Sequence, residues 1–214
     1  MYKYILFDFD GTVFDTVEGI TKSVQYALAK RGIAAELDSL RCFAGPPLVD
    51  MFMEKFDLSQ EEAEAATDDF RERYQPIGLY ECRVFPGIKE LLRALIDAGL
   101  HVGIATSKPQ HLAEKLLGDE DMLGLFEVIS GSDSDGNNNS KAAVLTRAMN
   151  ALGADKKETV LVGDTKYDVA GAKACGVECI GVRYGYAAEG ELASAGADHI
   201  VNDLQQLKAL LLNK

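Results

Sequence analysis

Short apolar runs alternate with amphipathic segments along most of the chain. The apolar runs, rich in aliphatic and aromatic residues as buried strands are, cover residues 3–9, 101–105, 126–129, 159–162 and 179–182. The amphipathic segments have helical periodicity and cover residues 86–98, 109–117, 140–152, 168–174 and 204–212. Strands and helices that alternate at this spacing predict an α/β fold with a doubly wound, mostly parallel, Rossmann-like sheet.

The stretch between the first two predicted strands has a different pattern. Helical periodicity continues there over residues 17–30, 37–43, 48–56 and 59–74. Ser59 and Glu62 form a capping-box sequence at the start of the last of these segments. We therefore expect a Rossmann-like core over 1–16 and 82–214, with a helical domain over 17–81 inserted in the first crossover.

Two carboxylates end the first predicted strand. Asp8 and Asp10 stand one residue apart after a run of bulky apolar residues, and Gly11 follows them. A carboxylate is costly to bury among apolar side chains unless its charge is compensated, so the pair indicates a metal site or a chemical task. The alternative is a tight Asp-Gly turn, which would need only Asp10 and Gly11 and would leave Asp8 unexplained.

Further polar residues follow three of the later strands. They are Thr106, Ser107, Lys141, Asp164 and Asp168. Ligands of doubly wound sheets bind outside the carboxyl ends of the strands. We therefore expect these side chains to share one rim of the sheet with the two N-terminal carboxylates.

The charge of this rim predicts a cation. Four carboxylates on one small rim repel each other, and Mg²⁺ accepts oxygen ligands while leaving room for a substrate phosphate. The whole chain has a formal charge of −12, from 22 Lys and Arg against 34 Asp and Glu. This charge argues against binding of nucleic acids or anionic membranes. A small anionic substrate would need local positive charge, which the cation would supply.

The motifs occur in the order found in a known superfamily. The sequence Asp8-Phe9-Asp10-Gly11-Thr12, followed by Thr106, Lys141 and Gly163-Asp164 with Asp168, resembles the signature of the haloacid dehalogenase superfamily in its phosphohydrolase form. The chain is similar to the branch with a small helical cap that holds phosphoglycolate phosphatase and β-phosphoglucomutase. Residues 18–28, 45–48, 105–109 and 181–186 resemble bacterial 5′-nucleotidase-like phosphatases. The resemblance implies a Mg²⁺-dependent phosphomonoesterase that acts on small phosphate esters, possible substrates being nucleoside 5′-monophosphates and phosphoglycolate.

The resemblance also implies catalytic roles that the chemistry supports. Asp8 is expected to attack phosphorus and form an aspartyl-phosphate. Asp10 is expected to protonate the leaving alcohol and later to deprotonate water. Thr106, the Ser107 backbone N–H and Lys141 are expected to hold the phosphoryl oxygens. The alternatives are that Thr106 caps the following turn and that Lys141 is a solvated lysine near a helix start.

The metal ligands follow from the same resemblance. Asp8, Asp164 and the main-chain carbonyl of Asp10 are expected to bind Mg²⁺, and Asp168 to support the metal through water or through another ligand. As an alternative or additional role, Asp168 caps the helix over 169–174.

The helical insert, a cap by resemblance, holds a candidate specificity loop at 41–48. Its glycine and prolines, beginning at Gly45, would turn the chain sharply and then fix it. Arg41, Phe43 or Leu48 could then contact the leaving group of the substrate. The alternative is a stiff connector between two helices.

A phosphosugar mutase of the β-phosphoglucomutase type and a non-catalytic phosphate-binding protein remain alternatives, whereas a dehalogenase is disfavoured because halide departure needs no proton from Asp10. Residues 133–139 resemble a calcium loop, but their glycine is misplaced for one, which favours a solvated loop. The four cysteines are scattered and are expected to be small buried side chains. Without a membrane span or signal peptide in the sequence, we expect a cytoplasmic protein, as a monomer or a dimer.

Overall fold

The computed structural model describes residues 1–133 and 140–213. Most of the calcium-like loop lies outside these residues. The chain forms two compact units, which we call the core unit (Met1–Phe14 and Val84–Lys214) and the insert unit (Asp15–Arg83). Their assignment as a catalytic core and a cap stays a prediction.

The core unit contains a six-stranded sheet with the order β5-β4-β1-β6-β7-β8, and its strand pairs are parallel. The strands are β1 (Tyr4–Phe7), β4 (His101–Pro109), β5 (Val128–Ser132), β6 (Thr159–Gly163), β7 (Glu178–Val182) and β8 (His199–Val201). In the central strand β1, Leu6 pairs with Gly103 on one side and with Leu161 on the other. The predicted doubly wound α/β fold is confirmed.

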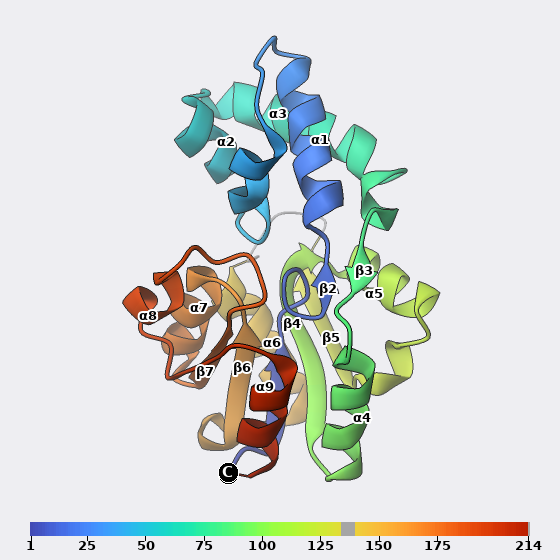
Figure 1. The fold of residues 1–214 in the computed structure, drawn as a ribbon, viewed down its shortest axis with the longest axis vertical. Coiled ribbons are helices and arrows are strands. Elements are labelled where there is room, and N and C mark those ends of the chain that lie inside the picture. The colour runs from blue at the N-terminus through green and yellow to red at the C-terminus, as the bar shows by residue number, and fades with distance from the viewer. Residues whose placement is uncertain (134–139, 214) are drawn as a thin grey trace. The chain divides into compact units, whose positions relative to one another are not determined.

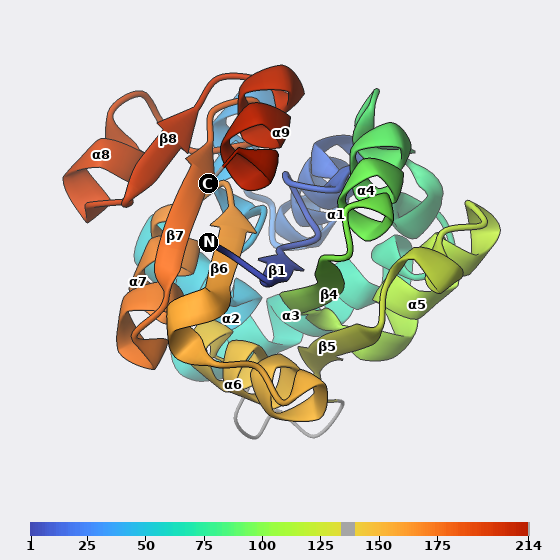
Figure 2. The same cartoon turned by 90° about the horizontal axis from the view of Figure 1, so that it is seen from below.

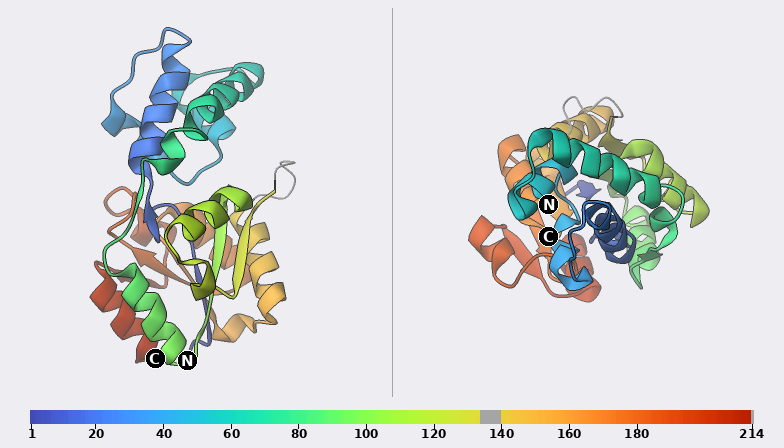
Figure 3. Two further views of the ribbon diagram at one scale, coloured as in Figure 1. Left: turned by 90° about the vertical axis from the view of Figure 1, so that its right-hand side faces the viewer. Right: turned by 90° about the horizontal axis from the view of Figure 1, so that it is seen from above.

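Helices cover both faces of this sheet. They are α4 (Ile88–Asp97), α5 (Gln110–Asp119), α6 (Lys141–Leu152), α7 (Lys166–Cys175), α8 (Glu191–Ala195) and α9 (Leu204–Leu212). Helices α4 and α9 lie on one face, and α6 and α7 pack together on the other (Figure 2). Between the sheet and the helices α6 and α7, Leu6 of β1 packs in one buried hydrophobic cluster with Val144 of α6 and Val169 of α7. The chain begins and α9 ends at the same end of the core unit (Figure 3).

Between Val17 and Tyr80, the elements of the insert unit are all helices. It contains α1 (Val17–Ala29), α2 (Leu48–Phe56), α3 (Gln60–Tyr74) and 3₁₀ helices over Leu37–Phe43 and Gly78–Tyr80 (Figure 1). The capping box predicted at α3 is present, because the Ser59 N–H donates to Glu62 Oε2 at 2.8 Å and the Glu62 N–H donates to Ser59 Oγ at 3.3 Å. The two segments that join the units pair as a two-stranded sheet of β2 (Phe14–Asp15) and β3 (Arg83–Val84).

Several predicted boundaries were wrong. Strand β4 continues to Pro109 instead of ending at residue 105, with a register shift against β5 between Ala105 and Pro109. Helix α7 begins at Lys166, before the predicted start. The sequence pattern also missed α8 and β8, which are too short for a clear period.

Two further properties bear on the predictions. Cys175 and Cys179 are buried as expected, whereas Cys42 is exposed. Across residues 1–133 and 140–213, the structure has no helix with the length and apolar character that crossing a bilayer requires.

Candidate active site

The topology brings the predicted site residues to neighbouring strand ends. Asp8 follows β1, Asp164 follows β6, and Thr106 lies near the end of β4. The Asp8 N–H donates to the Val162 carbonyl at 2.8 Å, so the pairing of β1 with β6 continues one residue beyond the strand. Since β1 lies between β4 and β6, their carboxyl ends form one rim.

Lys141 lies among the acidic residues of this rim. Its Nζ is 2.6 Å from Asp8 Oδ1 and 2.9 Å from Asp168 Oδ1, and it donates to the Ala105 carbonyl at 3.2 Å. Helix α6 positions it, because Lys141 is the first residue of α6 and the Ser140 side chain caps that helix by accepting from the Ala143 N–H. Burial would lower the pKa of Lys141, but attraction to the two carboxylates raises it above its usual value, so the side chain is an ammonium ion.

Asp8, which contacts this lysine, is buried. The Phe9 N–H also donates to Asp8 Oδ1, at 2.7 Å. Burial is the largest cause of the shift in the Asp8 pKa, which rises to about 7 although Lys141 opposes it. The carboxylate therefore needs more positive charge than Lys141 supplies.

Asp168 supports the lysine from α7. It is the third residue of the helix, and its Oδ2 accepts from the Thr165 N–H at 3.0 Å and from the Thr165 hydroxyl at 2.9 Å. Its Oδ1 faces Lys141 Nζ as an ion pair without well-directed hydrogen-bond geometry. Burial opposes ionisation, but Lys141 and Thr165 outweigh it and lower the pKa of Asp168. The N-cap residue of α7 is Thr165, so the prediction that Asp168 caps this helix is wrong. Asp168 is instead the third helical residue, which completes the capping box.

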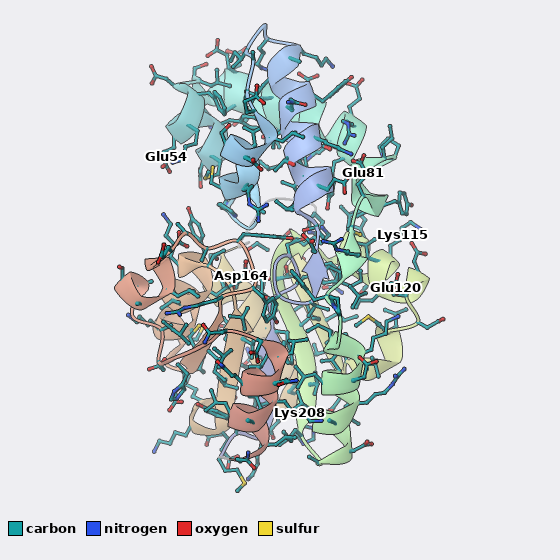
Figure 4. All side chains as sticks on the ribbon, in the orientation of Figure 1. Glu54, Glu81, Lys115, Glu120, Asp164 and Lys208 are labelled. Atoms are coloured by element: carbon teal, nitrogen blue, oxygen red, sulfur yellow. The ribbon has the colours of Figure 1, made fainter. Side chains whose placement is uncertain are left out.

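Asp164 is held closely by the backbone around it. Its side chain is fully buried, its Oδ1 accepts from the Thr12 hydroxyl at 3.2 Å, and its Oδ2 accepts from the Tyr186 N–H at 2.7 Å. A Cβ at Gly11 would lie 2.1 Å from Asp164 Oδ2, and one at Gly185 would lie 2.3 Å from Asp164 Cβ. Figure 4 labels this residue within the core unit.

Three of the carboxylates could hold a metal ion together. Asp8, Asp164 and Asp168 each offer an oxygen, and these oxygens lie within 4.8 Å of one another. Within the described part of the chain, no lysine or arginine forms an ion pair with Asp164, and burial followed by repulsion from the other two carboxylates raises its pKa well above the usual value. An all-oxygen set with excess negative charge fits a hard divalent cation such as Mg²⁺.

Asp10 lies apart from this group of three and has a different partner. Lys108 Nζ is 3.0 Å from Asp10 Oδ1, and both side chains are largely buried. No role is predicted for Lys108 from its place in the sequence. The signal that could have found it is a third polar residue directly after Thr106 and Ser107.

The remaining core residues of the prediction lie on β4. Thr106 is buried, and its hydroxyl accepts from the Lys108 N–H at 3.2 Å, which has the form of the predicted turn cap. Ser107 is half-buried. The role of both residues in holding phosphate stays a prediction.

The predicted specificity residues belong to the insert unit. Arg41 is exposed, and Gly45 has a φ of 111°. Phe43 is buried, with its ring centroid 5.0 Å from that of Phe52 and 6.1 Å from that of Phe56. Phe43 therefore packs inside its own unit, and the contact of these residues with a substrate stays a prediction.

Comparisons with known proteins identify the family of the chain. The family model described as haloacid dehalogenase-like hydrolase matches residues 5–182. A 5′-nucleotidase of Pseudomonas aeruginosa is 40% identical and covers 98% of this chain and 96% of its own length. A plasmid-encoded phosphoglycolate phosphatase of Cupriavidus necator is 35% identical and covers 97% of this chain and 92% of its own. The crystal structure of a predicted phosphatase from Clostridium acetobutylicum superposes with a TM-score of 0.96 at 40% identity, over 100% of both chains. The chain therefore belongs to the haloacid dehalogenase-like hydrolases and groups with the phosphatases of that family.

Proposed function

We propose that the protein is a Mg²⁺-dependent phosphomonoesterase that acts on small phosphate esters through an aspartyl-phosphate on Asp8. One observation carries the proposal. The buried Asp8 carboxylate has Lys141 Nζ 2.6 Å from one oxygen and shares an oxygen cluster with Asp164 and Asp168. Such a group can attack phosphorus while nearby positive charge stabilises the transferred phosphoryl group.

The contacts of Asp8 suggest which oxygen attacks. Lys141 and the Phe9 N–H both contact Oδ1, so we assign the attack to Oδ2. A bond forms between Asp8 Oδ2 and phosphorus as the bond from phosphorus to the leaving oxygen breaks. Asp10 gives its proton to that oxygen, and then takes a proton from the water that hydrolyses the aspartyl-phosphate. Inorganic phosphate leaves and Asp8 is regenerated.

The other residues hold charge and orient groups. Lys141, the Thr106 hydroxyl and the Ser107 N–H would bind the phosphoryl oxygens. Asp8, Asp164 and the Asp10 carbonyl would hold Mg²⁺, which when bound neutralises charge on the phosphoryl group. Asp168 keeps Lys141 charged and oriented, which supports the metal site indirectly.

The relatives suggest which esters to test first. One is named a 5′-nucleotidase and another a phosphoglycolate phosphatase. We propose nucleoside 5′-monophosphates and phosphoglycolate as substrates of this chain, with selection by residues 41–48 of the insert. The cytoplasmic location expected from the sequence stays a prediction.

A phosphate-release assay over nucleotides, sugar phosphates and phosphoglycolate tests the proposal. We expect Mg²⁺-dependent turnover that a chelator abolishes, and a loss of several orders of magnitude in Asp8→Asn, because an amide is a poor nucleophile. Asp97→Asn is the control, since Asp97 is an exposed aspartate on α4. Full activity in excess chelator would contradict the metal role. Isomerisation of a sugar phosphate without net phosphate release would instead favour a mutase, and binding of esters without turnover would favour a non-catalytic protein.

A further inference from the structure

We propose that Lys108 is a positioning residue for Asp10. Its ammonium group contacts Oδ1 of the Asp10 carboxyl group and holds that group apart from the oxygen cluster of Asp8, Asp164 and Asp168. The other oxygen of Asp10 then carries the proton that is given to the leaving group, and Asp10 does not become a side-chain ligand of the metal. This inference rests on the proposed function, because it assigns a cause to the division of labour between the two N-terminal aspartates.

The geometry of β4 places Lys108 beside Asp10. The strand changes register against β5 between Ala105 and Pro109, and Lys108 lies within this irregular segment. The side chains of Lys108 and Asp10 are only 3% and 11% exposed, and Nζ is 3.0 Å from Asp10 Oδ1. Nζ also lies 5.5 Å from the centroid of the Phe9 ring, within range of a cation–π contact.

A gain in the stability of the fold does not explain why Lys108 and Asp10 form a buried ion pair. Desolvation of two charges can cost as much as their attraction returns, so apolar residues of similar size often stabilise a protein equally well. What a buried ion pair does provide is a defined orientation. Here it fixes the carboxylate of Asp10, whose angle matters for proton transfer to a leaving group.

The two N-terminal aspartates form ion pairs with different lysines. Lys141 contacts Asp8 and Asp168, whereas Lys108 contacts Asp10. The oxygens that could hold a metal come from Asp8, Asp164 and Asp168, and Asp10 does not belong to that group among the described residues. Without the Lys108 charge, we expect the Asp10 carboxylate to turn toward the bound cation, which attracts it.

Leaving-group dependence distinguishes this role from a merely structural one. The phenolate of an aryl phosphate with an acidic phenol leaves without being protonated. The alkoxide of an alkyl phosphate is a much poorer leaving group and needs the proton from Asp10. The ratio kcat/KM is the right measure, since it reports the steps up to departure of the alcohol. We expect Lys108→Met to lower kcat/KM by about 100-fold for an alkyl phosphate and by less than about fivefold for p-nitrophenyl phosphate.

Two further variants complete the experiment. Lys108→Arg keeps the charge and should restore most of the alkyl phosphate activity. Lys115→Met is the matched control, because Lys115 is a half-exposed lysine on α5, labelled in Figure 4, and both esters should react as in the wild type. If Lys108→Met does not fold, Lys108→Gln gives the same ratio with a polar side chain.

The outcomes separate the two proposals. Equal losses for both esters in folded Lys108 variants, with no rescue by arginine, would overturn the positioning role. Absence of Mg²⁺-dependent hydrolysis of either ester by the wild type would overturn the proposed function itself. Tighter Mg²⁺ binding by Lys108→Met than by the wild type, measured by titration calorimetry without an ester, would support the predicted turn of Asp10 toward the cation, and equal binding would contradict it.

Discussion

At the scale of single residues, two glycines shape the site as much as the charged residues do, because they leave space for the Asp164 side chain. Asp164 fits between Gly11 and Gly185, where any Cβ would overlap its atoms. Gly185 also lies next to Tyr186, whose N–H donates to Asp164 Oδ2. The loop after β7 therefore orients a proposed metal ligand without contributing a charge of its own.

Substitution of this glycine tests that role. Gly185→Ala would place Cβ 2.3 Å from Asp164 Cβ, so Asp164 or the loop must move. We expect Mg²⁺ affinity to fall by about 10- to 100-fold, the usual effect of disturbing groups that orient a metal ligand. The control is Gly124→Ala, since a Cβ at Gly124 meets no atom within 4 Å. Unchanged Mg²⁺ titrations in Gly185→Ala would show that Asp164 tolerates the shift.

The sequence predicted which charged residues share the rim better than it predicted which of them form ion pairs. Strand ends in a parallel sheet converge, so Asp8, Asp164 and Lys141 could be placed on one rim from their positions alone. Lys108 follows Thr106 and Ser107 at the same strand end, but its pairing with Asp10 could not be predicted, because residues 106–108 read as a polar loop although they belong to β4. Its contact with Asp10 depends on an irregular register, which no periodic pattern encodes.

At the scale of elements, α1 and α3 of the insert unit are linked to the segment before β3 by charge. Arg73 donates two hydrogen bonds to the Glu81 carboxylate, at 2.9 and 3.1 Å, and Lys22 donates one at 3.1 Å. The hydrogen bonds from Arg73 are the largest cause of the lowered pKa of Glu81. Arg73 also donates to Ser23 Oγ on α1, at 3.0 Å.

This lowered pKa predicts an acid-sensitive contribution to stability. A carboxyl with a folded-state pKa below its unfolded value stabilises the fold above the unfolded pKa, about 4.3 for Glu, and loses that effect as pH falls through the folded pKa. We expect the midpoint of urea unfolding to fall below pH about 4 in the wild type and to depend less on pH in Glu81→Gln. Glu61→Gln, which changes an exposed glutamate on α3, should keep the wild-type dependence. Equal pH dependence in Glu81→Gln and the wild type would contradict this.

At the scale of the whole molecule, the topology of the core sheet and the place of the insert in the chain followed from the sequence. The alternating pattern predicted a parallel sheet, and the helical stretch predicted an insert after the first strand. Short elements such as β8 escaped prediction because three residues carry no readable period. The pattern gives no information on substrate contacts of the insert, since these depend on side chains far from the core motifs in sequence.

A substitution in the insert tests its proposed part in specificity. Arg41→Ala should change the ranking of kcat/KM among phosphate esters, because a group that contacts the leaving group affects esters unequally. Asp164→Asn should instead lower kcat/KM for all esters alike. Phe43→Ala is a poor probe, since loss of a buried phenyl ring costs about 3 to 5 kcal/mol of stability. A uniform effect of Arg41→Ala across the ester panel would mean that specificity is set elsewhere.

In the proposed mechanism, Asp8 carries the phosphoryl group covalently during turnover. Wild-type protein can be mixed with Mg²⁺ and an ester labelled in its phosphoryl group, quenched in acid during turnover, digested and sequenced by mass spectrometry. We predict a phosphoryl group on the peptide that contains Asp8, attached to that side chain, and no labelled peptide from Asp8→Asn. Labelled phosphate on any other residue, or rapid turnover without a labelled peptide, would contradict the account.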